Sequence, residues 1–127
     1  MTLDINPVVP ENRQLIQSYG DGRFKVTGEV YESSILIFPD RTEGWGVIAS
    51  TDISVDSLDA IVARKDAVDI LLVGCGPTFT AIPKGLRAGL KEHGIVLEWM
   101  DTGAACRTFN VLVAEERRVA AAIIAVD

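Results

Sequence analysis

The sequence predicts an α/β domain in which antiparallel strands precede a mixed sheet. In the first third, short segments of alternating apolar and polar residues are separated by glycine and proline turns, a pattern typical of antiparallel hairpins. From Ser54 onward, apolar strand-like runs alternate with helix-like segments, which predicts parallel strands joined by crossover helices. We therefore assign a single domain, 1–127, with mainly antiparallel strands in 1–50 and a β-α-β-α-β part in 51–127.

Four strands are expected in the first half of the chain. They are assigned to 14–19, 23–27, 31–38 and a segment containing Trp45 and Val47. The first two flank an Asp21-Gly22 turn, because these residues tolerate the positive φ of a tight hairpin. A reversal at Gly28 leads into the third strand, which Pro39 ends.

Three helices and three strands are expected in the second half. The helices start at Ser54, at Pro83 and at Asp101 or Thr102, and the strands are 69–73, 95–99 and 118–126. Ser54 is a preferred N-cap, Pro83 suits a first helical turn, and Gly94 and Ala114 end the second and third helices. The last segment contains alanines that favour a helix and β-branched residues that favour a strand. We assign a strand, because the charged residues 115–118 separate it from the preceding helix.

Composition and charge exclude several classes of function. The chain is 48% apolar and 24% charged, as in ordinary globular domains. Its net charge of −6 argues against nucleic-acid binding, which depends on clustered positive charge. Two cysteines and one histidine offer little for a disulfide framework or a zinc site, so we assign no metal ion and no cofactor.

No targeting or membrane-spanning pattern is expected. Residues 1–7 lack both a basic start and an apolar stretch, so we predict no secretory signal. The longest wholly apolar run, 119–126, has eight residues, whereas a membrane-spanning helix needs about twenty. We therefore expect a cytoplasmic protein that does not insert into a membrane, with its thiols reduced.

Several segments together resemble one protein family. They are Ile16-Gln17-Ser18-Tyr19-Gly20, Leu71-Leu72-Val73-Gly74-Cys75-Gly76, Gly94-Ile95-Val96, Met100-Asp101-Thr102, Ala105-Cys106-Arg107-Thr108-Phe109-Asn110-Val111-Leu112 and Glu116-Arg117-Arg118-Val119-Ala120-Ala121. The chain resembles the family of the mitochondrial respiratory complex I assembly factor 3, which also includes adipogenesis-associated Mth-domain proteins and uncharacterised bacterial members. The resemblance implies a three-layer fold around a central mixed five-stranded sheet. It implies no established enzymatic activity and no catalytic residue.

A crevice for an anionic group is expected where strands 69–73 and 95–99 end, because ligands of open α/β sheets bind beyond the carboxyl ends of the strands. There the glycine turn would face the third helix, whose free N–H groups suit a carboxylate or phosphate. The candidate ligand-binding residues are Gly74, Cys75, Gly76, Thr78, Thr102, Gly103, Cys106, Arg107 and Asn110. Alternatively, the glycines only permit a turn, Thr102 only caps its helix, and Arg107 pairs with a nearby acid.

Cys106 and Asn110 also have a structural interpretation, as core residues. Cys106 lies in the first turns of a helix, where a thiol pKa can be lowered, but it is more typical of a small core residue. His93, the only histidine, is expected at the opposite edge of the sheet. A redox pair of Cys75 with Cys106 is a further reading. Asn110 is expected to be buried and to hydrogen-bond the backbone of the glycine turn.

Three functions are compatible with these features. The leading one is a non-enzymatic binding or assembly-factor-like protein that docks an unknown protein partner, with a membrane-complex subunit as one candidate. The alternative is a small-molecule binding protein or enzyme that takes an anionic metabolite in the crevice at Gly74–Gly76 and Thr102–Arg107. The third is a structural homo-oligomer that pairs through an antiparallel edge strand.

Overall fold

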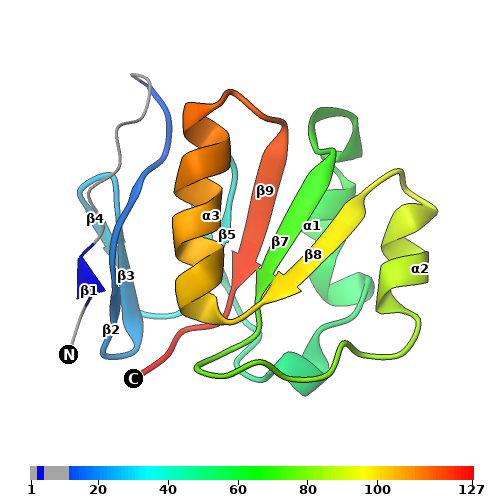
Figure 1. The fold of residues 1–127 in the computed structure, drawn as a ribbon, viewed down its shortest axis with the longest axis horizontal. Helices are drawn as coiled ribbons and strands as arrows, with labels where there is room; N and C mark the ends of the chain where they lie inside the picture. Colours follow the sequence, from blue (N-terminus) through cyan, green and yellow to red (C-terminus); the bar gives the residue numbers. More distant parts are fainter. Residues whose placement is uncertain (1–2, 5–11) are drawn as a thin grey trace.

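The computed structural model describes residues 3–4 and 12–127 and confirms the α/β fold with a central mixed five-stranded sheet (Figure 1). The order is β6-β5-β9-β7-β8, with β5 Ser34–Ile37, β6 Thr42–Trp45, β7 Ile70–Gly74, β8 Val96–Met100 and β9 Val119–Ile123. β7 is parallel to both β8 and β9, whereas β5 is antiparallel to β6 and β9.

The prediction of no secretory signal concerns residues 1–7. Apart from Leu3 and Asp4, these lie outside the described part of the chain.

A second, four-stranded antiparallel sheet precedes the central one. Its strands are β1 Leu3–Asp4, β2 Ile16–Gly20, β3 Arg23–Val26 and β4 Glu29–Tyr31. The turn between β2 and β3 forms at Asp21 and Gly22, whose φ angles of 55° and 73° confirm the predicted positive-φ turn. β1 was not expected from the sequence.

The strand predicted over 31–38 is wrong, because this segment contributes to both sheets. β4 ends at Tyr31 in the first sheet, and β5 starts at Ser34 in the central sheet. The physical reason is the difference in surroundings: β4 is largely exposed, whereas all four residues of β5 are buried because elements pack on both faces of the central sheet. The next strand, β6, also ends at Trp45 and does not reach Val47.

Helices cover both faces of the central sheet and create the three layers. α3 Thr102–Ala114 lies on the face toward the first sheet, and α1 Asp59–Val62 and α2 Leu86–Lys91 lie on the other (Figure 1). Short 3-10 turns occupy Ser50–Asp52, Asp56–Leu58 and Lys65–Ala67. No helix in the described ranges has the length and apolar character needed to cross a membrane.

The predicted helix ends are partly correct. The side chain of Asp101 caps α3 by accepting a 2.8 Å hydrogen bond from the Ala104 N–H. Ser54 Oγ accepts from the Ser57 N–H at 3.1 Å, as an N-cap does, but the element that follows starts as a 3-10 turn. The second helix does not start at Pro83, because Gly85 takes a left-handed φ of 83° and α2 forms only after it.

Two apolar cores lie on opposite faces of the central sheet. Strand alternation assigns them: on β7, Leu71 and Val73 face the core under α1 and α2, whereas Leu72 faces the core under α3. The α3 core includes Phe24 of the first sheet and Phe109 of the helix, so the first sheet and α3 are packed together.

The outer strand β8 is covered by α2. Leu86 and Leu90 on the inner face of this helix are buried, as predicted. Arg87, also in α2, donates a 2.6 Å hydrogen bond from Nη1 to the carbonyl oxygen of Leu97 in β8. This strand is at one edge of the sheet, so the bond occupies an acceptor that no neighbouring strand uses.

Candidate functional site

The structure brings the glycine turn and the first residue of α3 into direct contact. The Thr102 N–H donates to the Gly76 carbonyl at 2.8 Å, and the Gly76 N–H donates to Thr102 Oγ1 at 3.2 Å. Thr102 Oγ1 also donates to the Ile124 carbonyl at 2.7 Å. All three residues are buried, so these polar groups bind one another.

Gly74 is required by the close approach of α3 to β7. A Cβ atom at this position would lie 2.8 Å from Ile123 Cγ2, 3.0 Å from the Thr102 Cα and 3.1 Å from the Ala105 Cβ. Such contacts are shorter than van der Waals packing allows, so only glycine fits between helix and strand. The Gly74 carbonyl in turn accepts a 2.9 Å bond from the Ile124 N–H.

The N-terminus of α3 has little capacity left for an external anion. The Thr102 N–H donates to the Gly76 carbonyl. The Ala104 N–H donates to the Asp101 carboxylate, and the Ala105 N–H donates to the Asp101 carbonyl. The Asp101 carboxylate supplies the negative charge that a helix N-terminus favours. A bound phosphate or carboxylate would have to displace or tolerate this side chain.

The other predicted site residues are spread over different surroundings. Thr78 and Arg107 are exposed, and the Thr78 carbonyl accepts a 3.5 Å hydrogen bond from the Cys75 thiol. Gly103 lies against Tyr19, since a Cβ on it would be 2.5 Å from the tyrosine hydroxyl. The turn residues and Thr102 are therefore together, whereas Cys106 and Asn110 face the α3 core.

The two cysteines lie in different cores. Cys75 packs in the core under α1 and α2, and Cys106 packs in the core under α3, on the opposite face of the sheet. Both are buried and unpaired. Burial raises the pKa of the Cys106 thiol far above its ordinary value, although the nearby Arg107 opposes this shift. The Cys106 thiol is therefore protonated at neutral pH, which agrees with its reading as a core residue.

Asn110 is buried and hydrogen-bonded, but not to the glycine turn as expected. Its Oδ1 accepts from the Ile16 N–H at 3.0 Å, and its Nδ2 donates to the Ile16 carbonyl at 2.9 Å. The β2–β3 register shifts between Ile16 and Ser18, and this irregularity leaves the Ile16 backbone groups to Asn110. Asn110 therefore fastens the first sheet to α3.

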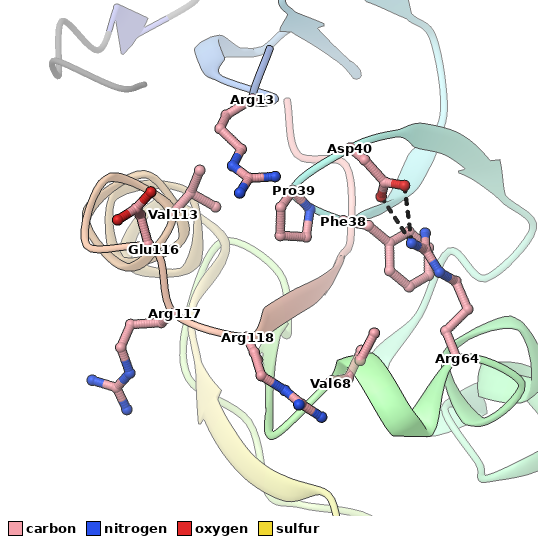
Figure 2. A pocket seen from close by; sticks show the side chains of 11 residues that line it. Arg13, Phe38, Pro39, Asp40, Arg64, Val68, Val113, Glu116, Arg117 and Arg118 are labelled. Atoms are coloured by element: carbon pink, nitrogen blue, oxygen red, sulfur yellow. Dashed lines mark hydrogen bonds and ion pairs between the residues drawn. The ribbon is translucent and has the colours of Figure 1, made fainter. Parts of the chain in front are cut away.

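A feature that the sequence did not reveal is a cavity of about 290 Å³ near the start of β7 and β9 (Figure 2). Four arginines line it: Arg13, Arg64, Arg117 and Arg118. Its apolar lining includes Phe38, Pro39, Val68 and Val113, and its acidic residues are Asp40 and Glu116. We call it the arginine cavity. Its arginines come from three separate parts of the chain, at 13, 64 and 117–118, so no local motif indicates it.

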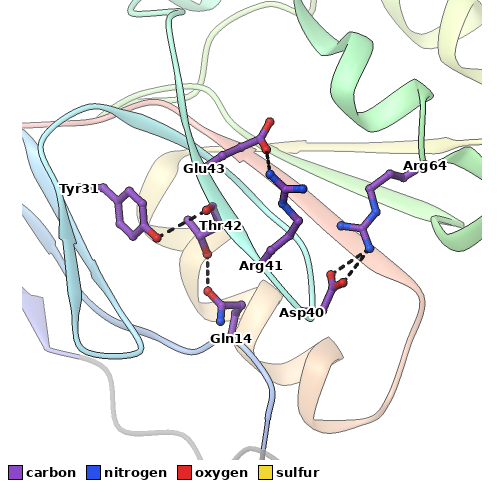
Figure 3. Close-up of polar contacts among 7 residues, drawn as sticks. All are labelled: Gln14, Tyr31, Asp40, Arg41, Thr42, Glu43 and Arg64. Carbon is purple, nitrogen blue, oxygen red and sulfur yellow. Dashed lines mark hydrogen bonds and ion pairs between the residues drawn. The ribbon is translucent and has the colours of Figure 1, made fainter.

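One wall of the arginine cavity is fixed by ion pairing. Arg64 Nη2 lies 2.9 Å and 3.0 Å from the two carboxylate oxygens of Asp40, and its guanidinium stacks on Phe38 at 4.2 Å (Figures 2 and 3). The adjacent Arg41 pairs with Glu43 at 2.5 Å. Beyond them, Thr42 Oγ1 donates to Gln14 Oε1 at 2.6 Å, and this bond joins β6 to the segment before β2 (Figure 3).

Two exposed apolar side chains lie on neighbouring loops near the carboxyl ends of β6 and β7. Ile48 is 81% exposed and Phe79 is 66% exposed. Their loops are joined by a 3.0 Å hydrogen bond from Thr80 Oγ1 to Ser50 Oγ, and Trp99 Nε1 donates to the Thr80 carbonyl at 2.8 Å. We call Ile48 and Phe79 the apolar loop surface.

Comparisons of the sequence with known proteins identify relatives over most of the chain. The model of a family described as proteins of unknown function, DUF498/DUF598, matches residues 16–124. An uncharacterized protein of Rhodobacter capsulatus is 37% identical over 86% of this chain and 82% of its own length. NADH dehydrogenase (ubiquinone) 1 alpha subcomplex assembly factor 3 of Danio rerio is 33% identical over 87% of this chain but only 63% of its own length. These matches confirm the resemblance to the assembly-factor family.

Solved structures share the fold. A crystal structure of a Bartonella henselae protein, described as an outer membrane protein, has a TM-score of 0.84 and 35% identity over 91% of this chain and 98% of that one. A Bordetella pertussis protein described as an Mth938-like domain has a TM-score of 0.81 and 24% identity over 97% and 92% of the two chains. The second likeness concerns the fold alone.

Proposed function

Since this chain belongs to the DUF498/DUF598 family, we propose that it is a non-catalytic, assembly-factor-like protein that binds a subunit of a respiratory NADH dehydrogenase. The observation that carries this proposal is the identity of 33%, over 87% of the chain, with a protein named for the assembly of that enzyme. The matched region is less than two thirds of that relative, so the proposal concerns the shared domain.

The surroundings of the thiol and of the glycine turn support a non-catalytic role. Cys106 is fully buried and protonated, and His93 follows α2, at the end of β8 opposite the glycine turn. The polar groups of Gly76, Thr102 and Ile124 already hydrogen-bond one another, so they are not open to an anion. This arrangement favours protein docking over the binding of an anionic metabolite at the glycine turn.

The apolar loop surface is the proposed contact with the partner. Large apolar side chains that are exposed on a folded domain lose water-accessible area when a partner covers them, and such anchors dominate interface energies. Thr80, next to Phe79, hydrogen-bonds Ser50 in the loop of Ile48 and also Trp99, so the two loops need little further ordering on binding.

The test is capture of NADH dehydrogenase subunits by the tagged full chain in the cells that make it. We expect the wild type to enrich specific subunits of that enzyme, and the double variant Ile48→Ser, Phe79→Ser to lose about tenfold or more of this enrichment. Val111→Ser is the matched control, because Val111 is also exposed, at 52%, but lies on α3. Equal capture by the double variant, or capture without any NADH dehydrogenase subunit, would refute the proposal.

A further inference from the structure

We propose that the arginine cavity binds a small organic anion, with its phosphate or carboxylate head on the arginines and its apolar body on the floor of the cavity. This inference does not depend on the docking of a partner, because the cavity lies at the opposite end of β7 from the glycine turn and the loop that carries Phe79. It concerns a ligand of the chain itself.

The charge of the cavity supports an anionic ligand. Four of the twelve basic residues line it, against two acidic ones, although the whole chain has a net charge of −6. All four are arginines, whose planar guanidinium groups bind carboxylates and phosphates through paired hydrogen bonds. A local excess of arginine in an acidic protein concentrates small anions at this position.

Two of the arginines are held in place and two are available. Arg64 is fixed by Asp40 and Phe38, and Arg118 donates to the Asp66 carbonyl. Within the described residues, the side chains of Arg13 and Arg117 make no hydrogen bond or ion pair. Their donors can therefore turn to a ligand without breaking a hydrogen bond or ion pair to any described residue.

The apolar floor defines the rest of the ligand. Phe38, Pro39 and Val68 line the cavity (Figure 2); Pro39 is partly exposed, whereas Phe38 and Val68 are only 1% and 2% exposed. Apolar walls exclude water and strengthen charge interactions at the mouth. The volume of about 290 Å³ is near the lower limit for ligand pockets, roughly 300 Å³, so the cavity suits one head group with one small ring or short chain.

The test is calorimetric titration of the full chain, at fixed pH and ionic strength, with inorganic phosphate, phenyl phosphate and phenylacetate. We expect saturable binding, with phenyl phosphate or phenylacetate bound about tenfold more tightly than inorganic phosphate because each adds an apolar body. Arg13→Gln and Arg117→Gln should each weaken the stronger ligand about fivefold or more.

Arg23→Gln is the matched control, because Arg23 is an exposed arginine of β3 that does not line the cavity. It should bind the probes as the wild type does. If Arg107→Gln loses binding while Arg13→Gln keeps it, the anion site is at the glycine turn and the proposal is refuted. The absence of saturable binding for all three probes refutes it too, and the circular dichroism spectrum of each variant checks that it is folded.

Discussion

The two ends of the central sheet differ in whether their polar groups are hydrogen-bonded within the protein. At the carboxyl ends of β7 and β8, the buried polar groups of Gly76, Thr102 and Ile124 bind one another. At the other end of β7 there is a cavity in which the side chains of Arg13 and Arg117 make no hydrogen bond or ion pair with the described residues. Ligands of open α/β sheets usually bind at the carboxyl ends of the strands. Here the topology brings the predicted residues together at that edge, but their buried polar groups are already hydrogen-bonded to one another.

The largest expected effect comes from forcing the closed end apart with Gly74→Ala. The added methyl group would lie within 3.1 Å of three neighbours, so we expect a loss of about 3 kcal/mol in the free energy of unfolding. Gly46→Ala is the control, because a Cβ there meets nothing within 4 Å, and it should change stability by less than about 0.5 kcal/mol. Urea unfolding measures both. An equally small effect of Gly74→Ala would show that α3 can move away from β7 at little cost.

A smaller effect is expected from removing the hydroxyl group that closes the same end. Thr102→Val keeps the side-chain shape but leaves the Gly76 N–H and the Ile124 carbonyl without their partner, so we expect a loss of about 2 kcal/mol. Thr102→Ser retains both hydrogen bonds and should lose about 1 kcal/mol or less. Thermal and urea unfolding of the pair separate the two. If both variants lose the same stability, the closure depends on packing and not on these bonds.

The smallest effect is expected at the open end, and it is a gain. Glu116 follows α3 in a left-handed conformation with a φ of 59°, the helix-end position that glycine prefers. Glu116→Gly should therefore raise the free energy of unfolding by about 1 kcal/mol. Glu116→Ala removes the carboxylate without relieving the backbone, and urea unfolding should show no such gain. A loss of stability in both variants would mean that the carboxylate is held by a neighbour.

Local patterns predicted most of the second half of the chain. The Asp101 cap, and the β-branched residues that follow the charged segment 115–118, identified α3 and β9, because these signals act within a few residues. The glycines and Thr102 were also correctly placed next to each other, since adjacent parallel strands end at the same edge. The expected cytoplasmic location, the oligomeric state and the anion crevice stay predictions.

Contacts between segments far apart in the chain could not be predicted from local sequence patterns. Asn110 and Ile16 are 94 residues apart, and their pairing depends on an irregularity in β2 that no local pattern marks. The arginine cavity likewise gathers Arg13, Arg64 and Arg117 from three regions of the chain. The division of 31–38 between two sheets was missed because its β-branched and aromatic residues suit either sheet.

The hydrogen bond from Arg87 to Leu97 has a consequence for how copies of this protein meet in a crowded solution. A β-strand at the rim of a sheet can template the addition of another chain, and the row of open carbonyl and amide groups is what makes such growth favourable. Here the Arg87 guanidinium already donates a hydrogen bond to one of those carbonyls, that of Leu97, and so lies beside the edge strand β8. Strand addition at β8 would first have to break this hydrogen bond, so we expect Arg87 to oppose it.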